Sequence, residues 1–173
     1  MSTESLDDEI RYGRDHRSVR IFVSSKMDGS LDEERQRAAA VIERRPTHTA
    51  WWWERDAPIG VLHSVKECAQ FAGTSDGLLL IVAGPLSDVI YQEYQAAKEA
   101  QAERYILIRG DFDELPSEVR EFIRRERGSV VTRNFKNANE LESLLHDALN
   151  MTAVRAMREV QLMRRPETRQ RHV

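Results

Sequence analysis

The chain has almost no cysteine for disulfide or zinc cross-links and no long apolar run for a membrane segment. Cys68 is its single cysteine, which excludes an internal disulfide and a cysteine-rich zinc site and is typical of a reducing compartment. The longest apolar run, residues 77–84, is far too short to cross a bilayer, and the acidic N-terminal stretch does not resemble a secretory signal. We therefore expect a soluble cytoplasmic protein with no membrane segment.

Signatures of several common catalytic sites are missing as well. The sequence contains no G-x-G-x-x-G dinucleotide motif and no P-loop. Its histidines never occur at the spacing of metal ligands. We expect no metal site and no resident cofactor.

The charge is unevenly distributed over a chain of 173 residues, a length that fits one domain. From residue 151 onward six arginines stand against Glu159 and Glu167, so this tail carries +4 and the remainder −7, for a net charge of −3. We expect a flexible leader (1–17), an α/β domain (18–150) and a basic helical tail or linker (151–173). Nucleic-acid binding is not expected, because no aromatic residue lies among the arginines to stack on bases.

The hydrophobic pattern alternates between strand and helix periodicity. Short β-rich runs predict strands at residues 19–25, 47–54, 77–83, 105–108 and 129–133. Helical periodicity predicts helices at residues 31–45, 61–72, 87–101 and 115–123, with a last helix that begins at Asn137 and continues as an exposed extension. This order predicts a three-layer α/β fold with a five-stranded parallel sheet in the flavodoxin-like order 2-1-3-4-5.

The most informative segment is the central strand together with the helix that follows it. Ligands of open parallel sheets bind at the carboxyl ends of the strands, where the next helix begins. On a helical wheel, Glu93 lies one turn from both Ile90 and Ala97, on the flank of the core-facing stripe. Most helix glutamates are exposed and pair with a neighbouring cation, but the position of Glu93 next to the strand end favours a catalytic role.

The loop after the first strand is a second candidate for ligand binding. It leads into a helix whose start has the form of a capping box, with Ser30 at the cap and Glu33 three residues on. Backbone amides and the helix dipole favour an anion there, which makes Ser24, Ser25, Lys26 and Ser30 candidate phosphate-binding residues. An ordinary strand–helix turn with hydroxyl caps explains the same pattern equally well.

Three consecutive tryptophans lie in the second predicted strand. Alternation places Trp51 and Trp53 on one face and Trp52 on the other, and helices on both sides of the sheet can bury all three. In the functional interpretation, Trp53 and Glu54 border the ligand crevice at the carboxyl end of the strand. Glu54 would then hold ribose hydroxyls, as the acidic residue of dinucleotide folds does.

Short motifs spread over residues 20–149 resemble a known family. They are Ile21-Phe22-Val23-Ser24-Ser25, Asp32-Glu33-Glu34-Arg35, Ser75-Asp76-Gly77, and Ser87 with Glu93-Tyr94 and Ala97. They are similar to the TIR-like domain of unknown function found at the front of many bacterial STAND-type ATPases and in stand-alone defence proteins. The wider group includes TIR domains and nucleoside deoxyribosyltransferases. The resemblance implies a flavodoxin-like fold and, in enzymatic relatives, cleavage of an N-glycosidic bond.

The resemblance also implies site residues and partners. Glu93 matches the catalytic glutamate of those relatives, and Ser87 belongs to the same motif. In TIR relatives the substrate is NAD+, whose phosphates would lie over the loop of residues 24–30, with Tyr94 or Trp53 beside the nicotinamide. Activity would require assembly with further copies of the chain or with a STAND sensor protein.

Three functions stay open. The first is a TIR-like NAD+ glycohydrolase or cyclase of anti-phage defence. The second is a nucleoside or nucleotide N-ribosyl hydrolase or deoxyribosyltransferase that uses Glu93 as nucleophile. The third is a non-catalytic TIR-like module that assembles proteins. Release of nicotinamide from NAD+ would select the first function, and release of a base from nucleosides the second. If neither reaction occurs even when the chain is forced to oligomerise, the third function is selected.

Overall fold

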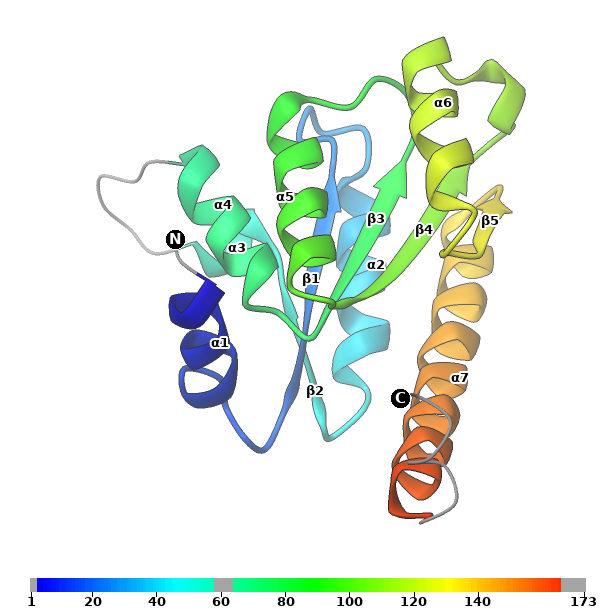
Figure 1. The fold of residues 1–173 in the computed structure, drawn as a ribbon. Coiled ribbons are helices and arrows are strands. Elements are labelled where there is room, and N and C mark those ends of the chain that lie inside the picture. Colours follow the sequence, from blue (N-terminus) through cyan, green and yellow to red (C-terminus); the bar gives the residue numbers. More distant parts are fainter. Residues whose placement is uncertain (1–2, 58–63, 166–173) are drawn as a thin grey trace.

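A five-stranded, all-parallel sheet forms the centre of the computed structural model, which describes residues 3–57 and 64–165. The strands are β1 (Val19–Ser25), β2 (His48–Trp51), β3 (Gly77–Val82), β4 (Glu103–Arg109) and β5 (Thr132–Phe135). Their order is β2-β1-β3-β4-β5 (Figure 1), which confirms the predicted α/β class and the flavodoxin-like strand order. The β1–β3 register pairs Ser24 with Leu80 and Ser25 with Ile81, so both serines lie level with the carboxyl end of the central strand.

Helices cover both faces of this sheet, as the apolar pattern of the strands requires. One face packs against α4 (Ser64–Gly73), α5 (Asp88–Glu99) and α6 (Ser117–Glu126), and the other against α2 (Asp32–Glu43) and α7 (Ala138–Arg164). Strand β3 is buried along its whole length, and its alternate leucines, Leu78 and Leu80 against Leu79, enter the two cores. The structure therefore has the three layers that the sequence predicts.

The second and fifth strands lie differently from their predicted ranges. Strand β2 ends at Trp51, and Trp53 begins the single turn α3 (Trp53–Asp56), because the Trp52 amide donates to the Asp56 carboxylate at 2.9 Å. Trp51 and Trp53 nevertheless pack with one core and Trp52 with the other, as alternation predicts. Strand β5 starts later than expected because the amides of residues 129 and 130 bond back to the Glu126 carbonyl at the end of α6.

Two predicted helix caps have different outcomes. Ser30 does not cap α2: Leu31 occupies the N-cap position, and the Ser30 hydroxyl and amide donate to Asp28 at 2.5 and 3.0 Å. This local turn around an aspartate competes with the capping box for the same serine. The cap of α7 is as predicted, since the Asn137 side chain accepts from the Glu140 amide at 3.0 Å.

The ends of the described chain are helical. Residues predicted as a flexible leader contain helix α1 (Thr3–Tyr12), and Arg14, just after it, pairs with Asp76 at the start of β3. At the other end α7 runs without a break across the predicted boundary at residue 150, and its second half is exposed. The first residues of the predicted helix 61–72, and residues 166–173, lie outside the described residues. No helix in the described ranges has the length and apolarity needed to span a bilayer.

Candidate functional site

Glu93 is buried where α5, β1 and α4 meet, beside the carboxyl end of β1. Ser87 caps the start of α5 by accepting from the Ile90 amide at 3.4 Å, and this start places Glu93 in the second turn. Glu93 is only 6% exposed; it accepts a hydrogen bond from the Ser24 hydroxyl on β1, and the Cys68 thiol on α4 lies near its carboxyl. Glu93 and Ser24, both predicted as site residues, are therefore in direct contact.

Burial makes Glu93 a group that titrates near neutrality. Removal from water raises the pKa of its carboxyl from 4.5 to about 7, although the Ser24 hydroxyl and the Cys68 thiol lower it in part. Such a carboxyl can accept or donate a proton at neutral pH. Burial, and then the Glu93 charge, raise the pKa of Cys68 to about 12. Cys68 thus stays a protonated thiol and is not a nucleophile.

A second buried glutamate shows what a structural carboxylate in this protein looks like. Glu126 of α6 accepts from the Tyr94 hydroxyl at 2.8 Å and pairs with Lys98 at 2.8 Å and Arg104 at 3.1 Å. Burial alone would raise the pKa of Glu126, but hydrogen bonds from Lys98 and Tyr94 outweigh it and lower that pKa. Within the described ranges Glu93 forms no ion pair. A buried carboxyl without a cation costs stability, which is typical of a group kept for chemistry.

Arg35 is a site residue that the sequence interpretation missed. It lies on α2 with its side chain 3% exposed, and it donates to the Ser25 hydroxyl at 3.2 Å and to the Lys26 carbonyl at 2.8 Å. It also pairs with Asp32 and, at 2.5 Å, with Glu54. The guanidinium therefore joins the β1–α2 loop to α3, and Glu54, predicted to hold ribose hydroxyls, already has a cationic partner.

The loop after β1, where a phosphate site was predicted, carries one lysine and one aspartate. The Lys26 ammonium pairs with Asp28 at 2.8 Å, and the hydrogen bonds from Lys26 and Ser30 hold the pKa of Asp28 well below its usual range. The first turn of α2 adds three carboxylates, each with an arginine partner: Asp32 with Arg35, Glu33 with Arg37 and Glu34 with Arg109. The phosphate site over this loop stays a prediction.

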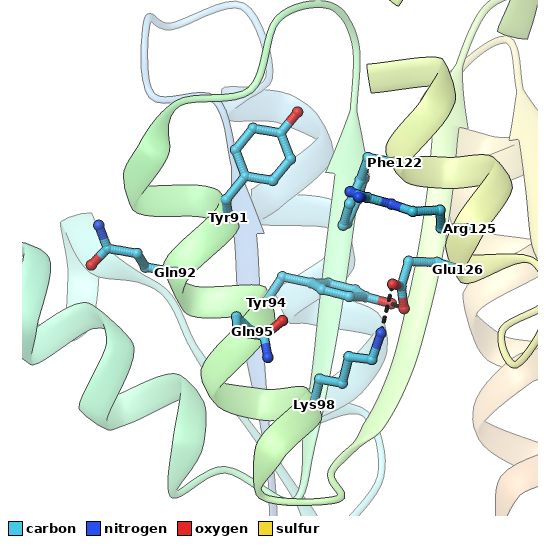
Figure 2. Close-up of a pocket in the computed structure, with 8 residues that line it drawn as sticks. All are labelled: Tyr91, Gln92, Tyr94, Gln95, Lys98, Phe122, Arg125 and Glu126. Atoms are coloured by element: carbon cyan, nitrogen blue, oxygen red, sulfur yellow. Dashed lines mark hydrogen bonds and ion pairs between the residues drawn. The ribbon is translucent and has the colours of Figure 1, made fainter. Parts of the chain in front are cut away.

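Tyr94 lies on the other flank of α5 from Glu93. A pocket of about 560 Å³ opens between α5 and α6, and Figure 2 shows the Tyr94 ring pointing across it to Glu126. Glu93 does not line this pocket. That Tyr94 stands beside a ligand held by Glu93 stays a prediction, and in the structure the Tyr94 hydroxyl donates to Glu126. The half-buried Trp53 packs edge-on against Trp51 with a centroid distance of 6.1 Å.

The assembled site consists of a titratable carboxyl, two hydroxyls and a buried cation along the end of β1. A carboxyl in the position of Glu93, next to the Ser24 hydroxyl, is suited to acid–base or nucleophilic chemistry, and Arg35 bonds to Ser25 in the adjoining loop. Within the described ranges, no group of three or more histidine, cysteine, aspartate or glutamate side chains is arranged to hold a metal ion. The chemistry that these residues can perform is that of a single carboxylate.

Comparisons with known proteins give no family. No protein-family model matches the chain, and no curated protein matches its sequence. Among solved structures it is similar to the metal-soaked Flv1 flavodiiron core from Synechocystis sp. PCC6803, with 12% identity and a TM-score of 0.48 over 79% of this chain. The chain spans 37% of the length of that protein. This distant likeness carries no functional argument.

Proposed function

We propose that this chain cleaves an N-glycosidic bond and that Glu93 is the catalytic carboxylate. The observation that supports the proposal most strongly is the burial of Glu93 at the carboxyl edge of the sheet without a cation, which raises its pKa to about 7. The resemblance of the motifs around Glu93 to TIR-like proteins supports the same reaction class. Ser24, which donates to Glu93, positions the carboxyl for the reacting sugar.

Glycosidic cleavage suits a single carboxyl of this kind. The bond between the sugar C1′ and the base nitrogen breaks with its electron pair leaving on the base, and positive charge develops on the sugar ring. The ionised form of Glu93 stabilises that charge, and it then takes a proton from the water whose oxygen bonds to C1′. The nicotinamide of NAD+ leaves as a neutral ring without a proton, whereas a nucleoside base needs one, which the protonated form of Glu93 can donate.

NAD+ is the substrate that the resemblance favours, and with it a role in bacterial defence. NAD+ consumption by an assembled form of the chain would deplete the cell of a cofactor. The phosphates of NAD+ must then lie away from the carboxylates of Asp28, Asp32 and Glu33, or be compensated by Lys26.

The acidic first turn of α2 supports a second candidate substrate for the same class of reaction. A neutral nucleoside carries no phosphate to be repelled by the first turn of α2. Its ribose or deoxyribose would meet Glu93 in the same way, either for hydrolysis or for transfer of the sugar to another base.

Chromatography of the products from full-length chain at high concentration tests the proposal. NAD+ and a panel of ribo- and deoxyribonucleosides are incubated separately with the protein. Release of nicotinamide supports the first substrate, and release of a free base the second. If the protein cleaves none of them, even when it is forced to oligomerise, the proposed reaction is wrong and a non-catalytic assembly module replaces it.

A further inference from the structure

Beyond Arg155, α7 makes no hydrogen bond or ion pair with the rest of the described chain. Its last contacts with the domain are the Tyr105 hydroxyl, which donates to Thr152 at 2.8 Å, and the pair of Arg155 with Glu103 at 2.5 Å. Figure 1 shows the helix running on past the end of the sheet. Large apolar side chains are exposed along it, with Met151 58%, Val154 41% and Leu162 48% exposed. This exposed surface needs an explanation that the fold does not supply.

The side of α7 turned away from the core has a regular pattern in the middle of the helix. Its exposed residues recur at alternating steps of four and three, the spacing at which two helices pair. We call them the α7 seam: Asp147, Met151, Val154 and Arg158. The core-facing residues of the same helix are a different set, Leu141, Leu145 and Leu149.

Charge along the α7 seam is divided into two halves. Its N-terminal end carries the Asp147 carboxylate, its middle is apolar with Met151 and Val154, and its C-terminal end carries the Arg158 guanidinium. Asp147 is 80% exposed, and its described neighbour is His146 at 3.5 Å. A parallel copy of this seam would place like charges opposite one another. An antiparallel copy places opposite charges together.

We propose that the α7 seam binds the α7 seam of a second copy of this chain in antiparallel orientation. One register satisfies the whole pattern, with its two-fold axis between Thr152 and Ala153. The facing pairs in that register are Met151 with Val154 and Asp147 with Arg158, each formed twice. The antiparallel arrangement also opposes the two helix dipoles. Because the apolar centre is small and the ion pairs are exposed, the dimer is weak and concentration-dependent.

The inference does not depend on the proposed function and is tested by charge reversal in trans. Asp147→Arg alone places arginine against arginine in the pair, and Arg158→Glu alone places glutamate against aspartate. We expect each variant to be monomeric in sedimentation velocity at concentrations where the wild type dimerises. Mixed one to one, the two variants restore both ion pairs, and we expect a heterodimer.

Charge changes elsewhere on the surface serve as controls for this test. Glu121→Arg on α6 and Arg164→Glu on the far side of α7 change the net charge equally but lie outside the α7 seam, and they should dimerise like the wild type. Restoration in the mixture also shows that both seam variants are folded. A wild type that stays monomeric at all concentrations overturns the proposal, as does a mixture that stays monomeric or single variants that still dimerise.

Discussion

At the scale of single residues, Glu93 and Glu126 show two ways of burying a carboxyl. Glu126 has Lys98, Arg104 and the Tyr94 hydroxyl as partners, so its charge is compensated. Glu93 accepts from the uncharged Ser24 hydroxyl and has no cationic partner among the described residues, and its pKa rises from 4.5 to about 7. A rise of this size corresponds to about 3 kcal/mol of folding free energy if it is fully expressed. Glu93 therefore weakens the fold at neutral pH, which is the expected cost of a reactive group.

The pH dependence of stability checks this assignment. The folded state keeps a proton on Glu93 that the unfolded state, with a pKa near its ordinary value, loses as pH rises above about 4.5. The stability that this proton supplies is present at low pH and is lost as pH rises through about 7. We expect Glu93→Gln to be more stable than the wild type at pH 8, by about 1–3 kcal/mol, and much less so at pH 5.

Urea unfolding at the two pH values measures the difference, and Glu126→Gln is the matched control. That control loses a compensated carboxylate, so it should be destabilised at pH 8 rather than stabilised. If Glu93→Gln and the wild type change in parallel from pH 5 to pH 8, the Glu93 carboxyl does not titrate near neutrality and the assignment is wrong.

A helical wheel predicts which way a helical side chain points. Being next to a site residue in the sequence does not. Glu93 was expected on the core flank, and it lies there. Arg35 interrupts an apolar stripe in the same way, in register with Leu31, Ala38 and Ile42, so its role could have been found by the same reasoning. The resemblance placed Tyr94 beside the ligand with Glu93, but consecutive helical side chains diverge by about 100°, and the Tyr94 hydroxyl points from α5 to Glu126 on α6.

At the scale of elements, Arg35 holds α2, the β1–α2 loop and α3 together through its bonds to Ser25, Lys26, Asp32 and Glu54. Arg35→Met leaves the stem but removes the charge, so Glu54 and Asp32 lose their buried partner. We expect a loss of about 3 kcal/mol in the free energy of unfolding, measured in urea. Arg37→Met on the exposed face of α2 is the control and should cost less than about 1 kcal/mol. Equal effects of the two substitutions would show that Arg35 is not a structural clamp.

Element boundaries depend on local side-chain competition that periodicity does not record. The segments that form the five strands of the sheet were predictable, because the spacing of apolar residues sets them. The start of α2 was not predictable, because the Ser30 hydroxyl and amide donate to Asp28 and Ser30 does not cap the helix. The end of β2 was not, since Asp56 closes a turn on the Trp52 amide. Each of these aspartates offers a backbone amide a nearby acceptor, and the sequence alone does not say which acceptor is used.

At the scale of the whole molecule, the first part of α7 packs on the domain and its last turns are exposed to solvent. The sequence placed this boundary at residue 150, but Thr152 and Arg155 still contact β4. A chain that ends after Arg155 should melt within a few degrees of the full chain, because it keeps the Tyr105 hydrogen bond, and it should no longer dimerise. A chain that ends at Met151 leaves the buried Tyr105 hydroxyl without Thr152 and should lose about a further 1 kcal/mol. Thermal melts and sedimentation check both, and identical melts would show that Thr152 and Arg155 do not contribute.

The most direct test of the account compares the turnover of Glu93→Gln with that of Glu126→Gln. Both substitutions remove the charge of a buried glutamate with little change in shape, and only Glu93 lies at the carboxyl edge of the sheet beside Ser24. With whichever of NAD+ or the nucleosides the wild type cleaves, we predict that Glu93→Gln forms no detectable product while remaining folded. Glu126→Gln should keep the activity of its folded fraction. Product formation by folded Glu93→Gln at the wild-type rate would contradict the catalytic assignment of Glu93.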